Sequence, residues 1–299
     1  LGPALFALVL WGPPGAGLTG IQASVAATTA LVATWWITAA LPLAATSLVP
    51  AVLFPMLGVL TAREVAPSYM RDLVLLFVGA FVVALGIERW GLHRRMALGI
   101  VARMGACPRR LVLGFMVAAA FLSLWINNTA TTLMMLPIAL AVADRVESAG
   151  GSKQFGLCLL LGTAYAASMG GIGTPVGTAP NQEFLGQLEI FFPEAPRITF
   201  AEWAVAFVPL VAVFIPVMWW LLTRVLTPVQ RGGLEGAGAV AKERAALGRM
   251  GSGERRMALA FAATALLWVF RADLVIGDLT MPGWSRLLMG PEQGDPAWY

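Results

Sequence analysis

Apolar segments of bilayer-spanning length recur along the whole chain, and they restrict its fold more than any other feature. A helix needs about 20 mainly apolar residues to cross the hydrocarbon core of a bilayer. The apolar segments lie at about residues 3–11, 20–37, 41–60, 73–88, 111–126, 130–143, 157–172, 203–223 and 257–271. Hydrophobic residues make up 59% of the chain and charged residues only 12%, whereas soluble domains carry about 25% charged residues. A single signal peptide cannot explain this pattern, so we predict an all-α membrane protein with several spans.

Basic residues gather in two regions between apolar segments, and they predict an orientation. The net charge is +4, but positive charge confined to such loops is typical of membrane orientation and not of nucleic-acid binding. One cluster occupies residues 89–110 and the other residues 224–256. By the positive-inside rule we expect both clusters in the cytoplasm. Cys107 and Cys158 are far apart in the chain and form neither a metal-ligand pattern nor a disulfide framework.

Residues 111–143 are predicted to form a re-entrant helical hairpin. The first apolar half, up to residue 126, would be about 24 Å long as a helix, and the second, from residue 130, about 21 Å. Both are shorter than a hydrocarbon core of about 30 Å. The polar residues Asn127, Asn128 and Thr129 separate them. A hairpin that begins and ends in the cytoplasm also lets the chain cross the membrane an even number of times between the two basic clusters.

A second interruption lies in GGIGTPVGTAPN, residues 170–181. Its four glycines permit a looped path and its two prolines cannot donate backbone hydrogen bonds, so we predict a broken helix over residues 157–192. Irregular backbone at membrane depth is tolerated only where it is buried in protein or lines a wet cavity. Two interrupted helices of this kind are the best sequence indication of a transporter's binding site near the bilayer midplane.

Broken helices offer ligands for both a cation and an anion. One half-helix end exposes N–H groups and the other exposes carbonyl oxygens, and sodium is bound by unwound carbonyls in such sites. Asn amides and Thr hydroxyls can hold a carboxylate. Since neither Lys nor Arg occurs between Arg110 and Arg145, a bound sodium ion would supply the positive charge.

Three segments resemble the divalent anion/sodium symporters, the family of citrate, succinate and sulfate carriers. FLSLWINNTATTLMMLPIALAV and GGIGTPVGTAPNQEFLGQL are similar to the two signature regions of that family's first half. FVGAFVVALGIERWGLHRRMAL, residues 77–98, resembles the stretch where its fourth span passes into a horizontal cytoplasmic helix. The likeness covers most of residues 40–270. It implies a homodimer in the bacterial inner membrane and an elevator mechanism, in which a transport domain moves against a scaffold domain.

The resemblance also implies roles for single residues. It implies a sodium site made of side chains at the hairpin tip and of loop carbonyls, at Ser123, Asn127, Asn128, Gly173 and Gly177. Asn128 and Thr129 match the residues that contact a substrate carboxylate. The family's triplet reads Ser-Asn-Thr, and this chain has Asn127 in place of the Ser, which keeps an oxygen but lengthens the side chain.

A domain layout follows from the same resemblance. The expected parts are scaffold helices over 1–110 that end in the horizontal helix, half of a transport domain over 111–223, a cytoplasmic loop over 224–256, and the start of a further span with an outer segment over 257–299. The transport half would contain the hairpin 111–143, the broken helix 157–192 and a helix over 203–223. Because no second Asn-Thr triplet follows residue 200, we expect the chain to be the first half of an inverted repeat.

The predicted function is sodium-coupled symport of a small divalent anion, with a C4-dicarboxylate such as succinate as the favoured substrate. The alternatives are a sodium-independent exchanger of dicarboxylate or sulfate with the same fold and, more remotely, a channel, since a re-entrant loop can form a selectivity filter. The two Asn residues would otherwise be hydrogen-bonding contacts between helices. An enzyme is not expected, because the chain has no HExxH motif and its one histidine, His93, lies in a basic loop.

Overall fold

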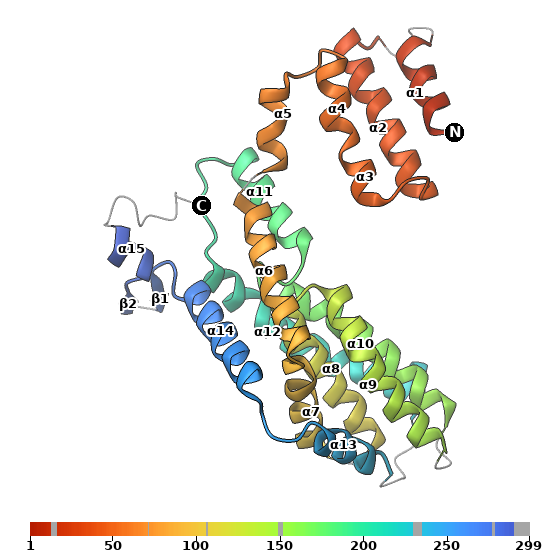
Figure 1. The fold of residues 1–299 in the computed structure, drawn as a ribbon, viewed down its shortest axis with the longest axis vertical. Coiled ribbons are helices and arrows are strands. Elements are labelled where there is room, and N and C mark those ends of the chain that lie inside the picture. The colour runs from red at the N-terminus through yellow and green to blue at the C-terminus, as the bar shows by residue number, and fades with distance from the viewer. Residues whose placement is uncertain are drawn as a thin grey trace. The chain divides into compact units, whose positions relative to one another are not determined.

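Over the residues that it describes, the computed structural model confirms the predicted helical character of the chain, with one pair of short strands as the exception (Figure 1). It describes residues 1–12, 17–70, 72–105, 107–148, 152–229, 235–276 and 279–289. The chain divides into two units, residues 1–75 and 76–299. This boundary lies at the start of a helix and not at residue 110, and the predicted division into scaffold and transport parts stays a prediction.

The described residues of the first unit form five complete helices. They are α1 (Gly2–Trp11), α2 (Gly20–Thr38), α3 (Leu43–Ser47), α4 (Val49–Met56) and α5 (Ala62–Tyr69). A capping box begins α2, in which the Thr19 N–H donates to the Gln22 side chain at 2.8 Å. The apolar segment predicted at 41–60 is divided into two helices. Pro50 stands at the second position of α4, where its missing N–H costs no hydrogen bond within the helix.

The second unit holds the rest of the chain. Its helices are α6 (Asp72–Arg89, which begins at the boundary), α7 (Leu92–Met104), α8 (Pro108–Ser123), α9 (Asn128–Ser148), α10 (Lys153–Ile172), α11 (Ala179–Phe191), α12 (Phe200–Leu221) with a π-helical turn η1 (Leu222–Leu226), α13 (Glu235–Ala246), α14 (Ser252–Val269) and α15 (Trp284–Met289). The strands β1 (Leu274–Ile276) and β2 (Leu279–Met281) pair antiparallel, with Leu274 opposite Met281.

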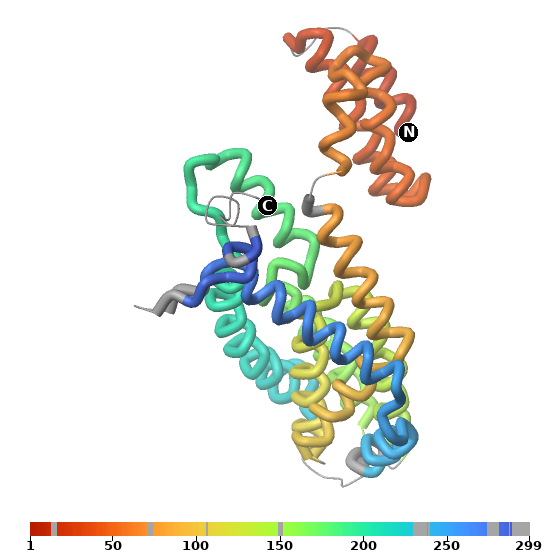
Figure 2. Tube along the Cα trace, turned by 60° about the vertical axis from the view of Figure 1, so that its left-hand side comes forward, coloured from red at the N-terminus to blue at the C-terminus, as the bar shows by residue number. Residues whose placement is uncertain are grey.

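Helix α8 is the centre of this unit. It packs against α7, α9, α10 and α12, and α8, α9 and α10 lie together in both ribbon and tube views (Figures 1 and 2). Ala118 and Ala119 on α8 have no solvent exposure, and Phe115 and Met116 are equally buried. Since lipid tails are as apolar as the side chains, helices in a bilayer associate through close packing, which small residues permit.

Five stretches of helix in the described part of the chain are long and apolar enough to cross a membrane. They are Gly20–Thr38 (α2), Ala62–Arg89 (α5 and α6 taken together), Asn128–Ser148 (α9), Lys153–Ile172 (α10) and Phe200–Leu226 (α12 with η1). These stretches agree with the predicted membrane protein of several spans. Within residues 77–98, where we expect a span to pass into a horizontal helix, α6 ends at Arg89 and α7 begins at Leu92; the horizontal cytoplasmic placement of α7 stays a prediction.

The two arms of the predicted hairpin differ in length. Helix α8 has 16 residues and is about 24 Å long, as predicted. Helix α9 has 21 residues, about 31 Å, so the expected length of about 21 Å for this arm was wrong. Charged residues such as Asp144 and Arg145 end the apolar segment but not the helix, since polar residues continue a helix readily. The length argument for a re-entrant hairpin therefore applies to α8 alone.

Candidate functional site

The turn between α8 and α9 is built by its own polar residues. Helix α8 ends at Ser123 and α9 begins at Asn128. The Thr129 N–H donates to Asn127 Oδ1 at 2.9 Å, so Asn127 caps the N-terminus of α9 as asparagines commonly do. Behind it, the Thr131 hydroxyl donates to the Ile126 carbonyl at 3.3 Å. Two of the polar side chains in this stretch thus form hydrogen bonds with backbone groups of the turn.

Ser123 and Asn128 join the two helices across the turn. Ser123 has no solvent exposure, and its hydroxyl donates to Asn128 Oδ1 at 2.8 Å. In this arrangement the Ser123 oxygen keeps its lone pairs and the Asn128 carbonyl oxygen keeps one. Two neutral side-chain oxygens therefore lie side by side with acceptor capacity left for a cation.

Trp125 fixes the tip of the turn against other helices. Its ring stacks on Phe200 with centroids 6.0 Å apart and meets Phe261 edge-on at 5.6 Å. These partners belong to the start of α12 and to α14. Aromatic pairs of this kind add roughly 0.5–1.5 kcal/mol each beyond the area they bury, so the turn is held by packing as well as by hydrogen bonds.

The predicted broken helix is present. Helix α10 ends at Ile172 and α11 begins at Ala179, with the glycine-rich loop between them. The Asn181 side chain, 7% exposed, donates to the carbonyls of Gly171 and Thr174, both at 2.8 Å. The Thr174 hydroxyl donates to the Leu124 carbonyl. Asn181 therefore shapes the loop, and Thr174 ties it to the turn between α8 and α9.

Two glycines bring the loop and the turn into direct contact. A Cβ on Gly171 would lie 2.0 Å from Asn128 Oδ1, and one on Gly177 would lie 2.5 Å from the Gly171 carbonyl oxygen and 2.8 Å from that of Ser123. No other residue type fits at either position without a shift of the backbone or of Asn128. Ser123, Asn128 and Gly177, all predicted site residues, are therefore brought together, with Gly171 as an addition.

The remaining predicted site residues lie around this cluster. A Cβ on Gly173 would lie 2.4 Å from Leu124 Cδ2, which places Gly173 beside the turn. Thr129 is exposed. Asn127, besides capping α9, lines a cavity of about 10 Å³ together with Phe77 and Thr178, a space for about one water molecule.

Sequence reasoning missed Thr174 and Asn181. Asn181 directly follows Pro180 at the start of α11, and an amide in the first turn after a glycine-rich loop is the signal that points to it. The hydroxyl of Thr174, within the loop itself, gave no comparable signal.

The cluster contains oxygen ligands without a formal charge. The carbonyl ends of α8 and α10 meet the N-terminal ends of α9 and α11 here, so partial negative and positive charges of the helix ends lie close together. Over the described residues, no group of three or more His, Cys, Asp or Glu side chains could hold a metal. The site is therefore suited to a weakly polarising cation with neutral oxygen ligands and, at the N-terminal ends, to an anion.

Comparison with known proteins places the chain in a family. Residues 3–288 match the family model described as the sodium:sulfate symporter transmembrane region. The chain is 37% identical over 283 residues to the sodium-dependent dicarboxylate transporter SdcS of Staphylococcus saprophyticus, an alignment that covers 92% of this chain and 54% of the relative. It is 38% identical over 285 residues to the protein of the same name in Staphylococcus aureus, with the same coverage. The chain spans about half the length of these curated relatives. On the family match, the chain belongs to the sodium:sulfate symporter family, which confirms the resemblance to the divalent anion/sodium symporters.

Proposed function

We propose that the chain forms the first half of a symporter that couples sodium to the transport of a small dicarboxylate, such as succinate, across the bacterial inner membrane. The observation that carries this proposal is the meeting of two helix interruptions at Ser123, Asn128, Gly171 and Gly177. The names of the two staphylococcal relatives, both sodium-dependent dicarboxylate transporters, support the same function. The relatives are transporters and not enzymes by name, which agrees with our prediction that the chain is not an enzyme.

Sodium would be held by the neutral oxygens of the cluster. Ser123 Oγ and Asn128 Oδ1 lie 2.8 Å apart, and the carbonyl oxygens of Ser123 and Gly171 lie 2.8 and 2.5 Å from the position that a Cβ on Gly177 would take. Asn181 donates to the Gly171 carbonyl, but a carbonyl oxygen has a second lone pair. We also propose that Asn127 and Gly173 belong to the sodium shell, as predicted. Because the Asn127 side chain already caps α9, both residues would bind the ion mainly through their backbone carbonyl oxygens.

The dicarboxylate would be held next to this ion. Asn128 and Thr129 open α9, so their amide and hydroxyl groups lie at the positive end of a helix. The N-terminus of α11 lies beyond the same loop. A bound sodium ion adds the positive charge that the cluster lacks. We propose that an inverted second half supplies ligands for the other carboxylate.

Coupling would follow from the position of Asn128 between three elements. It begins α9, accepts from Ser123 on α8, and lies against Gly171 on α10. An ion bound there would fix the turn and the loop relative to one another, and this order would favour the anion-binding arrangement of the α9 N-terminus. The re-entrant path of α8 and α9, the homodimer and the elevator movement of a transport domain belong to the same proposal.

The test is uptake of radiolabelled succinate into proteoliposomes that contain the full-length protein. We expect saturable uptake driven by an inward sodium gradient and abolished by Asn128→Ala. The matched control is Gln187→Ala, which removes a half-buried amide on α11 that donates to the exposed Glu183 at 2.6 Å and should leave uptake unchanged.

Each other outcome of this experiment has a defined meaning. Uptake that ignores the sodium gradient but responds to preloaded succinate would replace symport by exchange. Uptake of sulfate in preference to succinate would change the substrate, in keeping with the description of the family model. Full activity of Asn128→Ala would refute the site.

A further inference from the structure

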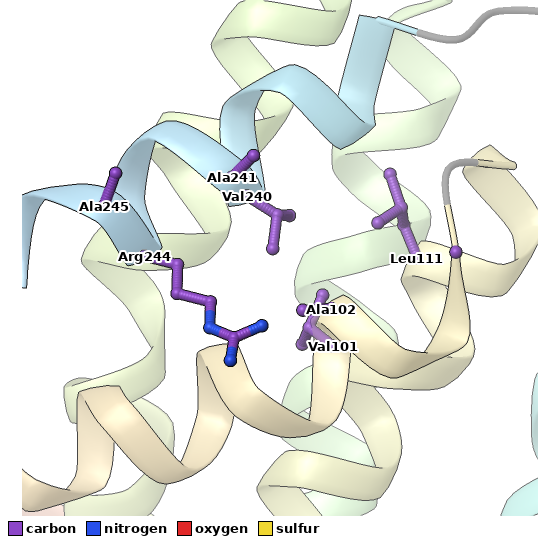
Figure 3. Close-up of a pocket in the computed structure, with 8 residues that line it drawn as sticks. Val101, Ala102, Leu111, Val240, Ala241, Arg244 and Ala245 are labelled. Carbon is purple, nitrogen blue, oxygen red and sulfur yellow. The ribbon is translucent and has the colours of Figure 1, made fainter.

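A groove on the second unit lies away from the cluster at the helix interruptions. Helices α7 and α13 enclose a cavity of about 550 Å³ together with the start of α8 (Figure 3). Its wall is mainly apolar and includes Val101, Ala102, Leu111 and Val240. The Arg244 side chain extends from α13 toward α7 at this cavity (Figure 3). The volume is in the range of sites for small molecules.

A second cavity continues along α7. It has a volume of about 320 Å³, shares Arg244 with the first cavity, and is lined by Arg95, Arg103 and Met250 among others. Arg110 comes close as well, since its Nη1 lies 4.0 Å from the position of a Cβ on Gly105, a residue that lines the first cavity. One groove, which we call the α7–α13 groove, thus presents several guanidinium groups beside an apolar wall.

The acidic residues near this groove are already paired. Glu243 accepts from Arg94 at 3.1 Å, and Glu254 accepts from Arg95 at 2.5 and 3.0 Å. Within the described part of the chain, the Arg103 guanidinium donates to the Gly99 carbonyl of its own helix and to no other group. Among the described residues, no carboxylate pairs with Arg103 or Arg244. The groove therefore keeps a surplus of positive charge.

We propose that the α7–α13 groove binds the headgroup of an anionic phospholipid. Guanidinium groups bind phosphate oxygens in paired hydrogen bonds, and the apolar wall formed by Val101, Ala102 and Val240 suits the glycerol and the first carbons of the acyl chains. Basic pockets beside membrane helices on the cytoplasmic side bind such headgroups, and both helices belong to the basic regions for which we predict that side. A free phosphate would gain nothing from the apolar wall. The inference does not depend on the proposed transport function.

The experiment measures lipid binding to the full-length protein in a neutral detergent. The protein is titrated with phosphatidylglycerol, with phosphatidylcholine that has the same acyl chains, and with glycerol 3-phosphate. Native mass spectrometry measures the bound fraction at each concentration. We expect selective binding of phosphatidylglycerol. The double variant Arg103→Gln/Arg244→Gln should weaken that binding by roughly thirtyfold, since each of the two basic residues near a lipid surface contributes about 1 kcal/mol. Arg256→Gln, which removes an exposed arginine outside the groove, is the matched control.

A second variant makes the test independent of charge. Ala241→Phe keeps the arginines and fills the cavity that Ala241 lines, so it should weaken phosphatidylglycerol binding too, with an unchanged melting temperature. Equal loss in Arg256→Gln would indicate unspecific attraction and overturn the proposal. Equal affinity for glycerol 3-phosphate would overturn the lipid as occupant. Equal binding of phosphatidylcholine would do the same.

Discussion

The polar side chains at the helix interruptions are neutral, whereas those at the contact between α7 and α14 carry charges. Near the turn, Ser123 and Asn128 are neutral and bond to one another at 2.8 Å. At the contact between α7 and α14, Arg95 and Glu254 carry full charges and form two hydrogen bonds, at 2.5 and 3.0 Å. The first pair retains acceptor capacity, whereas Glu254 and Arg95 neutralise each other.

This difference supports the proposal that the cluster at the helix interruptions is the ion site. A charge inside a membrane protein is costly and needs a permanent partner, so a resident carboxylate would hold a cation tightly or stay protonated. A neutral cluster gains charge only while an ion is bound, which suits an ion that must leave again. Arg95 also donates to the carbonyls of Leu247 and Gly248, at 3.3 and 3.1 Å, so its bond to Glu254 is part of a contact that holds α14 and the segment before it to α7.

The largest effect is expected when the neutral cluster is filled by a methyl group. Gly171→Ala would place a Cβ 2.0 Å from Asn128 Oδ1, so Asn128 must leave its position between α8 and α10. We expect sodium-driven succinate uptake to fall on the order of a hundredfold, as misplacement of a reacting group by about 1 Å does in enzymes. Uptake into proteoliposomes, with protein amount as the reference, measures this.

The matched control lies on the same helix. A Cβ on Gly156 would meet only the Cβ of Ala143, at 3.4 Å, which is ordinary contact. Gly156→Ala should transport like the unchanged protein and gain up to about 1 kcal/mol of helix stability. If Gly171→Ala also transports normally, contact between Asn128 and α10 is not needed, and the cluster is not the ion site.

A smaller effect, on stability and not on transport, is expected at the charged pair. Glu254→Gln removes the negative charge that pairs with Arg95. The contact is largely buried, since the Arg95 side chain is 28% exposed and the Glu254 side chain 10% exposed. Hydrogen bonds to charged groups contribute about 1.5–3 kcal/mol, so we expect a loss of about 2 kcal/mol. Thermal unfolding of the purified protein in detergent measures it.

The comparison is sharpened by the more exposed pair beside it. Glu243→Gln breaks the ion pair with Arg94, in which the Arg94 side chain is 45% exposed and the Glu243 side chain 32% exposed. Exposed ion pairs contribute less than about 1 kcal/mol to stability. The melting temperature of this variant should therefore change less than that of Glu254→Gln. Equal shifts would mean that burial of the Arg95 pair adds nothing to its strength.

Much of the site follows from the sequence because its geometry is local. Asn127, Asn128 and Ser123 are within five positions of one another, so the interruption of an apolar stretch already placed them at one turn. The break after Ile172 follows equally from glycine and proline, which act on the backbone where they stand. The sequence pattern predicted only that these residues lie close together. Their roles as sodium and substrate ligands were implied by the resemblance to the family.

The parts that could not be predicted depend on distant contacts. Asn181 donates to carbonyls seven and ten positions earlier in the chain, and Arg95 meets Glu254 across 159 positions. Gly171 and Asn181 lie on different helices with the loop between them, and 159 positions separate Arg95 from Glu254, so no local pattern reveals these contacts. The end of α9 was misjudged for a related reason, since apolarity reports where a helix meets lipid and not where it ends.

The smallest effect is expected at Asn127, where the chain departs from the family's Ser. Its Oδ1 accepts from the Thr129 N–H at 2.9 Å, and a serine oxygen caps a helix about as well. We therefore expect Asn127→Ser to keep both the melting temperature and the sodium dependence of uptake nearly unchanged. Asn127→Ala should lose the cap and about 1 kcal/mol of stability, measured by thermal unfolding.

The two variants together decide what Asn127 does in the turn between α8 and α9. A capping role moves stability in Asn127→Ala and leaves Asn127→Ser unaffected, because only the oxygen near the Thr129 N–H matters. A ligand role, as the resemblance implies, depends on side-chain length. In that case Asn127→Ser would shift the sodium concentration for half-maximal uptake at unchanged stability. A shift of about tenfold, which corresponds to roughly 1.4 kcal/mol of ion binding, would place the Asn127 side chain among the sodium ligands and make Asn128 one member of a larger set.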